Sequence, residues 1–168
     1  MLRLLLLRHA KAEPATGAGD FARPLSVAGR HQAETVGLKV GAEFGSPNLI
    51  LCSPARRTRE TLQGLLSSLQ PPPDVRFIDE LYSGDAETYR SVIKLNSQAA
   101  ETVLVVAHNP ALRDLAVDLV SASESARLTR FPVATLAEIV FPAEHWDVID
   151  GGKGRLSALF FTESAEGN

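Results

Sequence analysis

The chain has 168 residues, of which 45% are hydrophobic and 22% charged, and its formal net charge at pH 7 is −3. This size and hydrophobic content predict one globular domain over residues 1–162, followed by a short flexible tail over residues 163–168. The small negative charge excludes a general basic surface for nucleic acid, so any anion site must be local.

Cysteine content and hydropathy narrow the class of protein further. The single cysteine, Cys52, excludes an intrachain disulfide and cannot form a cysteine-based zinc site by itself. Charged residues interrupt the apolar run Leu4–Leu7 from Arg8 onward, unlike the core of a signal peptide. No other stretch approaches the ~20 apolar residues of a membrane span. We therefore expect a cytoplasmic protein that has no membrane partner.

In chain order, short apolar runs alternate with helical patterns. The first run and the fourth lack polar alternation, as is typical of strands covered on both faces in a mainly parallel sheet. The predicted strands are Leu2–Leu7, Leu49–Cys52, Val75–Ile78, Val103–Ala107, Leu136–Phe141 and Ser157–Phe161.

The helices between these strands begin at recognisable capping residues. Ser26 precedes a helix over Val27–Phe44, and Ser53-Pro54 combines a capping hydroxyl with a first-turn proline. Asp85 is expected to cap the third helix, and Asn109-Pro110 repeats the cap-plus-proline start, whereas Ser121–Ser125 is expected to be a loop. The order predicts an α/β three-layer sandwich, with a mostly parallel central sheet flanked by helices and no cap domain.

Three of the predicted strands end in polar clusters. Arg8-His9 follows the first strand, Ser53–Arg57 the second and His108-Asn109 the fourth. Ligand sites of α/β sheets gather at the carboxyl ends of strands, so the three clusters are expected to converge. Arginine forks and helix N-termini suit a phosphate dianion, whereas no cluster of carboxylates or cysteines suits a metal. We expect a phosphate site that needs no metal or other cofactor.

Histidine is the credible nucleophile at these strand ends. Cys52 lies inside an apolar strand without the flanking amides of a phosphate-binding cysteine loop, so we interpret it as an inert core residue.

The motifs together resemble the histidine phosphatase superfamily, also called phosphoglycerate mutase-like, and within it the SixA-type phosphohistidine phosphatases. Four segments carry the resemblance in the family's order. They are Leu7-Arg8-His9-Ala10-Lys11-Ala12, a Ser-x-x-x-Arg-x-x-x-Thr motif over Ser53–Thr61, Glu80-Leu81-Tyr82-Ser83-Gly84-Asp85, and Val106-Ala107-His108-Asn109-Pro110. A further SixA-like segment is Asp20–Gly29, and the resemblance covers nearly the whole chain.

The resemblance implies a role for each motif residue. His9 would attack phosphorus in a neutral form, and Arg8, Arg57 and His108 would hold the phosphoryl oxygens, with His108 acting best when protonated. Water would then hydrolyse phospho-His9. Glu80 is the family-matched general acid and base, although Asp85 or Asp20 could take that role. Arg23 and Asn109 would add further contacts to the bound substrate.

Chain length guides the expected substrate. The intervals 58–79 and 81–107 leave no room for the helical cap that larger members of the superfamily carry. An open site suits a phosphorylated protein side chain, so we expect a phosphohistidine phosphatase of signal transduction acting on histidine-containing phosphotransfer domains. Two alternatives stay open: a broad phosphomonoesterase of small phosphate esters, and a non-catalytic phosphoprotein-binding module.

Overall fold

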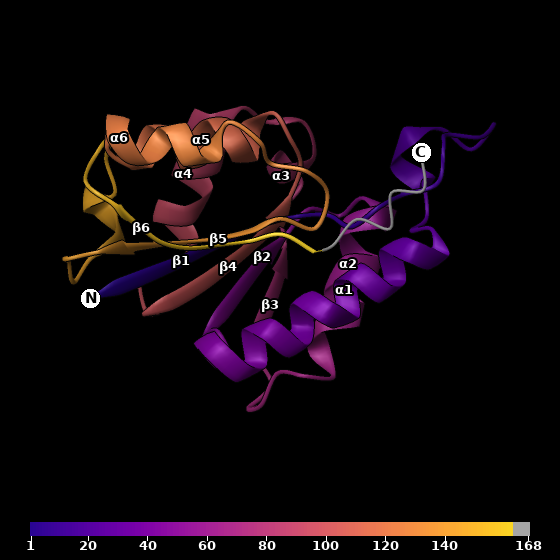
Figure 1. The fold of residues 1–168 in the computed structure, drawn as a ribbon, viewed down its shortest axis with the longest axis horizontal. Helices are drawn as coiled ribbons and strands as arrows, with labels where there is room; N and C mark the ends of the chain where they lie inside the picture. The colour runs from indigo at the N-terminus through magenta and orange to yellow at the C-terminus, as the bar shows by residue number, and fades with distance from the viewer. Residues whose placement is uncertain (163–168) are drawn as a thin grey trace.

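The structure, a computed structural model, describes residues 1–162 and has three layers, with one β-sheet between two layers of helices (Figure 1). The strands are β1 (Leu2–Arg8), β2 (Leu49–Cys52), β3 (Asp74–Phe77), β4 (Thr102–Ala107), β5 (Leu136–Phe141) and β6 (Arg155–Phe160). They lie in the order β3-β2-β4-β1-β5-β6. The strands β3, β2, β4 and β1 are mutually parallel, and β5 is antiparallel to both of its neighbours. The predicted α/β three-layer fold with a mostly parallel sheet is confirmed.

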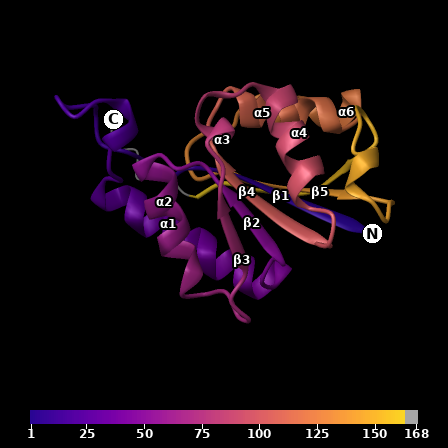
Figure 2. The ribbon, with the colours of Figure 1, turned by 180° about the vertical axis from the view of Figure 1, so that it is seen from behind.

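The two helical layers differ in size. On one face lie α1 (Val27–Lys39), which continues into a π-helical turn over Val40–Phe44, and α2 (Arg56–Leu66). On the other face lie α3 (Glu80–Ser83), α4 (Ala86–Asn96), α5 (Ala111–Leu119) and α6 (Ala122–Ser125), as the view from behind also shows (Figure 2). Across residues 1–162, each helix is too short or too polar to span a bilayer.

Both faces of the central strand are buried, which explains its lack of polar alternation. Leu4 and Leu6 of β1 belong to the core cluster beneath α4 and α5. Leu5 and Leu7 point the other way and belong to the cluster beneath α1 and α2. Successive strand residues face opposite sides, so a strand between two helical layers must be apolar at both sets of positions.

Two of the predicted helix starts are confirmed and two are wrong. Ser26 accepts from the amide of Gly29, and Asp85 accepts from that of Thr88. Ser53 does not cap α2, because the chain bends at Pro54 and Ala55 and the helix begins only at Arg56, with Ala55 at the cap position.

The cap expected from Asn109 is also absent. Pro110 occupies the cap position of α5, and the amide of Leu112 donates to the His108 carbonyl at 2.9 Å. That first-turn amide therefore needs no side-chain acceptor.

The segment Ser121–Ser125, expected to be a loop, contains the short helix α6. A reciprocal capping box between Ser121 and Glu124 begins this helix.

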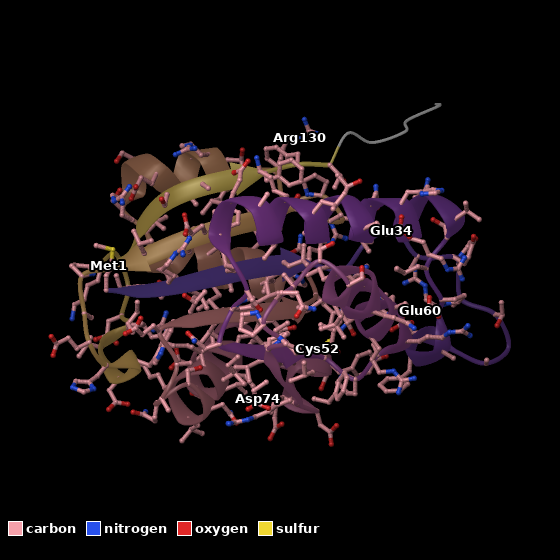
Figure 3. The ribbon with its side chains drawn as sticks, turned by 90° about the horizontal axis from the view of Figure 1, so that it is seen from below. Met1, Glu34, Cys52, Glu60, Asp74 and Arg130 are labelled. Atoms are coloured by element: carbon pink, nitrogen blue, oxygen red, sulfur yellow. The ribbon has the colours of Figure 1, made fainter. Side chains whose placement is uncertain are left out.

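The register of the parallel strands positions the polar clusters. Arg8 at the end of β1 lies opposite Ala107 of β4, and Cys52 at the end of β2 lies opposite Val106. His9, Ser53 and His108 follow these positions and therefore share one edge of the sheet. In Figure 3, Met1 marks the amino end of β1, and Glu60 of α2 lies toward the opposite end of the molecule.

The single domain over 1–162 stays a prediction, and the tail predicted over 163–168 lies outside the described residues.

Candidate active site

His9 sits at the carboxyl end of β1 with a defined tautomer. Its ring is 8% exposed, and Nδ1 lies 2.8 Å from the carbonyl oxygen of Ala10. A carbonyl can only accept, so Nδ1 must carry the proton and donate it to this bond. Nε2 of a neutral His9 therefore carries the lone pair, which is the form that a nucleophile needs.

The surroundings of His9 keep it neutral. Burial foremost, together with the charges of Arg57, Arg8 and Arg23, lowers the pKa of His9 to about 4, against the opposing effect of the Ala10 hydrogen bond. At neutral pH the imidazole is unprotonated at Nε2. The expectation of a neutral His9 agrees with this environment, although burial contributes more than the neighbouring charges.

Two arginines bring positive charge to this buried imidazole. Arg57, on the first turn of α2, is 7% exposed and donates from Nη1 to the Asp20 carbonyl at 3.0 Å. Arg8 donates from Nη1 to the carbonyl of Phe131, also at 3.0 Å. Burial and the charge of Arg57 lower the pKa of Arg8. Two cations held together away from water create a strong local preference for an anion.

His108, at the carboxyl end of β4, lies beside His9. The two ring centroids are 5.4 Å apart, and Nε2 of His108 is 2.7 Å from the hydroxyl oxygen of Ser53. Burial, Arg57 and His9 lower the pKa of His108 to about 3. These effects favour a neutral His108 in the ligand-free site, because a buried imidazole beside arginines resists a further positive charge, and a protonated His108 with phosphate bound stays a prediction.

Three buried nitrogens of this cluster have no hydrogen-bond partner among residues 1–162. They are Nε of Arg8, Nε of Arg57 and Nδ1 of His108. Both guanidinium Nε–H groups are obligatory donors, and buried donors in native proteins are usually satisfied. A phosphate group offers acceptors with the charge that these donors prefer.

The segment after His9 is tied to both helices of its layer. The amide of Ala10 donates to the Thr61 hydroxyl, which donates in turn to the Arg57 carbonyl. The amide of Lys11 donates to the Gln32 side chain. A Cβ at Gly29 would lie 2.0 Å from the Lys11 carbonyl oxygen, so this close approach requires glycine. These contacts fix the backbone that orients His9.

A second set of side chains forms the rim of the cluster. The Asp20 carboxylate accepts from Arg57 at 3.2 Å, from the Tyr82 hydroxyl at 2.8 Å and from Arg23 at 3.2 Å. These hydrogen bonds, that of Tyr82 foremost, hold the pKa of Asp20 at about 2. The rim thus joins the short 3-10 helix Asp20–Ala22 to α2 and α3 and places Arg23 next to the predicted site.

Asn109 lies beside Arg8. Its Nδ2 donates at 2.8 Å to the same Phe131 carbonyl that accepts from Arg8. This shared acceptor links Asn109 to the orientation of the Arg8 guanidinium, which is the site role that the contacts support.

Glu80 is the predicted site residue that the structure does not join to the others. It is exposed at the first position of α3, and its carboxylate has no hydrogen bond or ion pair among residues 1–162. Asp85 caps α4 through the amide and hydroxyl of Thr88. Of the three candidate acids, Asp20 and Asp85 are held by hydrogen bonds, whereas Glu80 is free to approach a substrate.

Several residues that contact the site were not predicted to do so. Ser53 belongs to the polar cluster predicted after the second strand, but only a capping role is predicted for it. Tyr82 belongs to the motif around Glu80, but no role is predicted for it. The Phe131 carbonyl has no side-chain signal in the sequence, because any residue type offers the same backbone acceptor. The Ser53 position within the Ser-x-x-x-Arg motif was the one usable signal.

The remaining groups to consider are the Cys52 thiol and side chains that could bind a metal ion. Burial raises the pKa of the Cys52 thiol to about 12, as expected of an inert core cysteine. Residues 1–162 contain no group of three or more His, Cys, Asp or Glu side chains that could hold a metal ion.

Comparisons with known proteins find a family model and relatives that are similar to this chain. A model of the family described as histidine phosphatase superfamily (branch 1) matches residues 4–94. An uncharacterized protein of Mycobacterium tuberculosis strain H37Rv is 30% identical over 152 residues, covering 87% of this chain and 93% of the relative. An uncharacterized chloroplastic protein of Arabidopsis thaliana is 33% identical over 131 residues, covering 72% of this chain and 60% of the relative.

Two solved structures have the same fold as this chain. A proposed phosphohistidine phosphatase SixA from Agrobacterium tumefaciens has a TM-score of 0.82 and 30% identity, over 96% of this chain and 98% of that one. A proposed SixA from Nakamurella multipartitia has a TM-score of 0.86 and 26% identity, over 97% of both chains.

Proposed function

Since the chain belongs to branch 1 of the histidine phosphatase superfamily, we propose that it hydrolyses phosphohistidine on proteins such as histidine-containing phosphotransfer domains. That it is a phosphatase follows from the family and its SixA-type neighbours. The observation that carries the mechanism is the neutral, buried His9, whose Nδ1–H bond to Ala10 leaves the Nε2 lone pair available beside two arginines.

In the proposed first step, Nε2 of His9 attacks phosphorus in line. The new Nε2–P bond forms as the bond between phosphorus and the leaving nitrogen of the substrate histidine breaks. Arg8, Arg57 and His108 bind the phosphoryl oxygens, where their unpaired donors stabilise the charge that develops. The leaving imidazole takes a proton, for which Glu80 is the proposed donor.

In the second step, water attacks phospho-His9. Glu80 would accept a proton from this water, the Nε2–P bond would break, and inorganic phosphate would leave as His9 regains its neutral form. Arg23 would add charge at the rim, and Asn109 would keep Arg8 in place through the shared Phe131 carbonyl. The transfer between two similar phosphoramidates is nearly balanced in energy, so little driving force is needed for the first step.

The architecture around the site supports a protein substrate. Between Arg57 and His108 the chain forms only the rest of α2 and then β3, α3, α4 and β4, all of which belong to the sheet or its covering helices. No inserted domain covers the catalytic edge in this interval of the described chain. An open edge can admit a folded partner that presents a phosphorylated side chain.

The test combines substrate choice with trapping of the intermediate. The protein is incubated with a phosphohistidine phosphotransfer domain, p-nitrophenyl phosphate and glycerol 2-phosphate, and acid-labile phosphate on His9 is detected by mass spectrometry after rapid quenching. We expect trapping in the wild type and in His31→Ala, a control histidine that is exposed on α1, and none in His9→Ala.

Each other result selects a different function. Efficient turnover of glycerol 2-phosphate without cleavage of the phosphotransfer domain would favour a small-molecule phosphomonoesterase. Binding of phosphoprotein without turnover would favour a binding module. A Glu80→Gln variant with unchanged rates on a poor leaving group would remove Glu80 from its proposed role.

A further inference from the structure

We infer that Phe21 and Tyr82 form a stacking subsite for a planar, aromatic leaving group at the rim of the phosphate site. The inference rests on the proposed function for the position of the phosphoryl group and adds the side chains that recognise the departing group. It concerns two side chains that the proposed mechanism does not use.

The subsite is the outer end of a row of four rings. His9 and His108 have centroids 5.4 Å apart, and Tyr82 lies edge-on to His108 at 5.7 Å. Phe21 in turn lies edge-on to Tyr82 at 5.0 Å. His9 and His108 are buried, whereas Phe21 is 47% exposed, so the row leads from the nucleophile to solvent.

The rim is held in place by polar contacts rather than by a hydrophobic core. Phe21 directly follows Asp20, whose carboxylate is bound by Arg57, Arg23 and the Tyr82 hydroxyl. The Asp20 carbonyl accepts a further bond from Arg57. An isolated exposed phenylalanine needs no explanation, but the residue before this one is fixed by five hydrogen bonds, the fifth from the Arg23 amide to the Asp20 carbonyl. The hydrogen bonds of Asp20 therefore hold Phe21 at the rim, where its ring is exposed.

The direction of the reaction points the leaving group toward this rim. In-line attack by His9 places the departing atom on the far side of phosphorus from Nε2. The ring row is buried at His9 and His108 and exposed at Phe21, so a group that departs toward solvent along the row can meet Tyr82 and Phe21. An imidazole or phenol there can make offset or edge contacts with both aromatic faces, whereas an alkyl alcohol cannot.

The experiment measures selectivity between leaving groups. The rates of wild type, Phe21→Ala and Phe21→Leu are compared on a phosphohistidine peptide, p-nitrophenyl phosphate and glycerol 2-phosphate. We expect Phe21→Ala to lower the ratio of kcat/KM for either planar substrate over glycerol 2-phosphate about three- to tenfold. The change should appear mainly in KM. Phe21→Leu should lower the same ratio nearly as far, because leucine keeps apolar area but lacks the ring.

Two further variants separate stacking from general damage. Tyr82→Leu should lower the ratio as Phe21→Ala does, whereas Tyr82→Phe keeps the ring and should lower it by less than Tyr82→Leu. Leu95→Ala removes an exposed apolar side chain near the end of α4 and should leave the ratio unchanged. An unchanged ratio in Phe21→Ala, or an equal loss on all three substrates, would overturn the subsite.

The subsite and the proposed function can fail separately. If the phosphohistidine peptide is not cleaved but the ratio for p-nitrophenyl phosphate still falls, the proposed substrate is wrong and the aromatic subsite stands. If the peptide is cleaved and neither ratio responds to Phe21→Ala, the phosphatase function stands and the subsite does not.

Discussion

Two regions of the site are held in different ways. The strand-end region consists of Arg8, His9, Arg57 and His108, with Ser53 bound to His108, and its reactive side chains are mostly buried. The rim region consists of Asp20, Phe21, Arg23 and Tyr82. Asp20 and Phe21 are exposed, Arg23 and Tyr82 are half-buried, and hydrogen bonds from Arg23 and Tyr82 meet at the Asp20 carboxylate.

From this difference we expect the strand-end region to determine the reaction rate and the rim to determine substrate preference. Burial sets the protonation state of the two histidines and concentrates the arginine charge, which are requirements of phosphoryl transfer. The rim lies at the solvent end of the proposed subsite, and hydrogen bonds around Asp20, not core packing, hold its side chains. Changes in the strand-end region should therefore cost rate and stability, and changes at the rim should alter substrate preference.

The largest effect is expected from Arg57→Ala. This change removes a buried guanidinium beside His9 and should lower kcat/KM for p-nitrophenyl phosphate about 10²- to 10³-fold, as loss of one charge-stabilising donor commonly does. The matched control is Arg59→Ala, an exposed arginine on another face of α2, which should change the rate less than about twofold. Similar losses in both variants, measured by initial rates, would contradict the division into two regions.

Acid should destabilise the strand-end region through its histidines. The folded pKa values of His9 and His108, about 4 and about 3, lie below the ordinary value of 6.5, so the unfolded chain binds their protons first. The free energy of unfolding should therefore fall as pH drops below about 6.5, by on the order of 1–2 kcal/mol per histidine at pH 5.

The measurement for acid destabilisation is urea unfolding at pH 7.5 and pH 5. His108→Gln removes one of the two titrating imidazoles and should lose a smaller free energy between these pH values than the wild type does. His31→Gln, on the exposed side of α1, should behave as the wild type. An identical pH response in all three proteins would show that the histidines are not the cause.

Much of the fold could be predicted because its signals are local. Consecutive apolar residues in Val103–Ala107 indicated a strand covered on both faces, and Ser26 and Asp85 marked helix starts where the structure has them. Asn109 failed as a cap because a backbone carbonyl already satisfied the first turn of α5. That backbone hydrogen bond depends on how the chain turns between β4 and α5, which cannot be read from the residue type at position 109.

The same contrast applies to the site. Arg8 ends β1, and His9 and His108 directly follow β1 and β4, so the parallel register alone brings their positions together. Tyr82 and Phe21 come from a four-residue helix and a 3-10 turn, whose placement depends on the long-range contacts of Asp20. Glu80 matches its motif, but the motif does not specify which way a residue of so short a helix points.

A smaller effect is expected where the segment after His9 packs on α1. Gly29→Ala would place a Cβ 2.0 Å from the Lys11 carbonyl oxygen, so backbone must move. We expect a loss of about 1–3 kcal/mol in the free energy of unfolding, with a lower kcat because the backbone next to His9 shifts. Gly17→Ala meets no atom within 4 Å and serves as the control. Equal stability of the two variants, by urea unfolding, would show that the approach at Gly29 is easily relieved.

The smallest effects come from removing one hydroxyl in each region. Tyr89 is fully buried, donates to the Leu81 carbonyl at 2.6 Å and accepts from the His108 amide at 3.4 Å. Tyr89→Phe leaves both groups without that partner and should cost about 1–2 kcal/mol in unfolding free energy. Tyr82→Phe removes a hydroxyl whose partner, Asp20, keeps its arginines and its access to water, so it should cost less than about 0.5 kcal/mol. If Tyr82→Phe proved as costly as Tyr89→Phe in urea unfolding, the rim would be part of the cooperative core, and the division of the site into a core-held region and a separately held rim would be wrong.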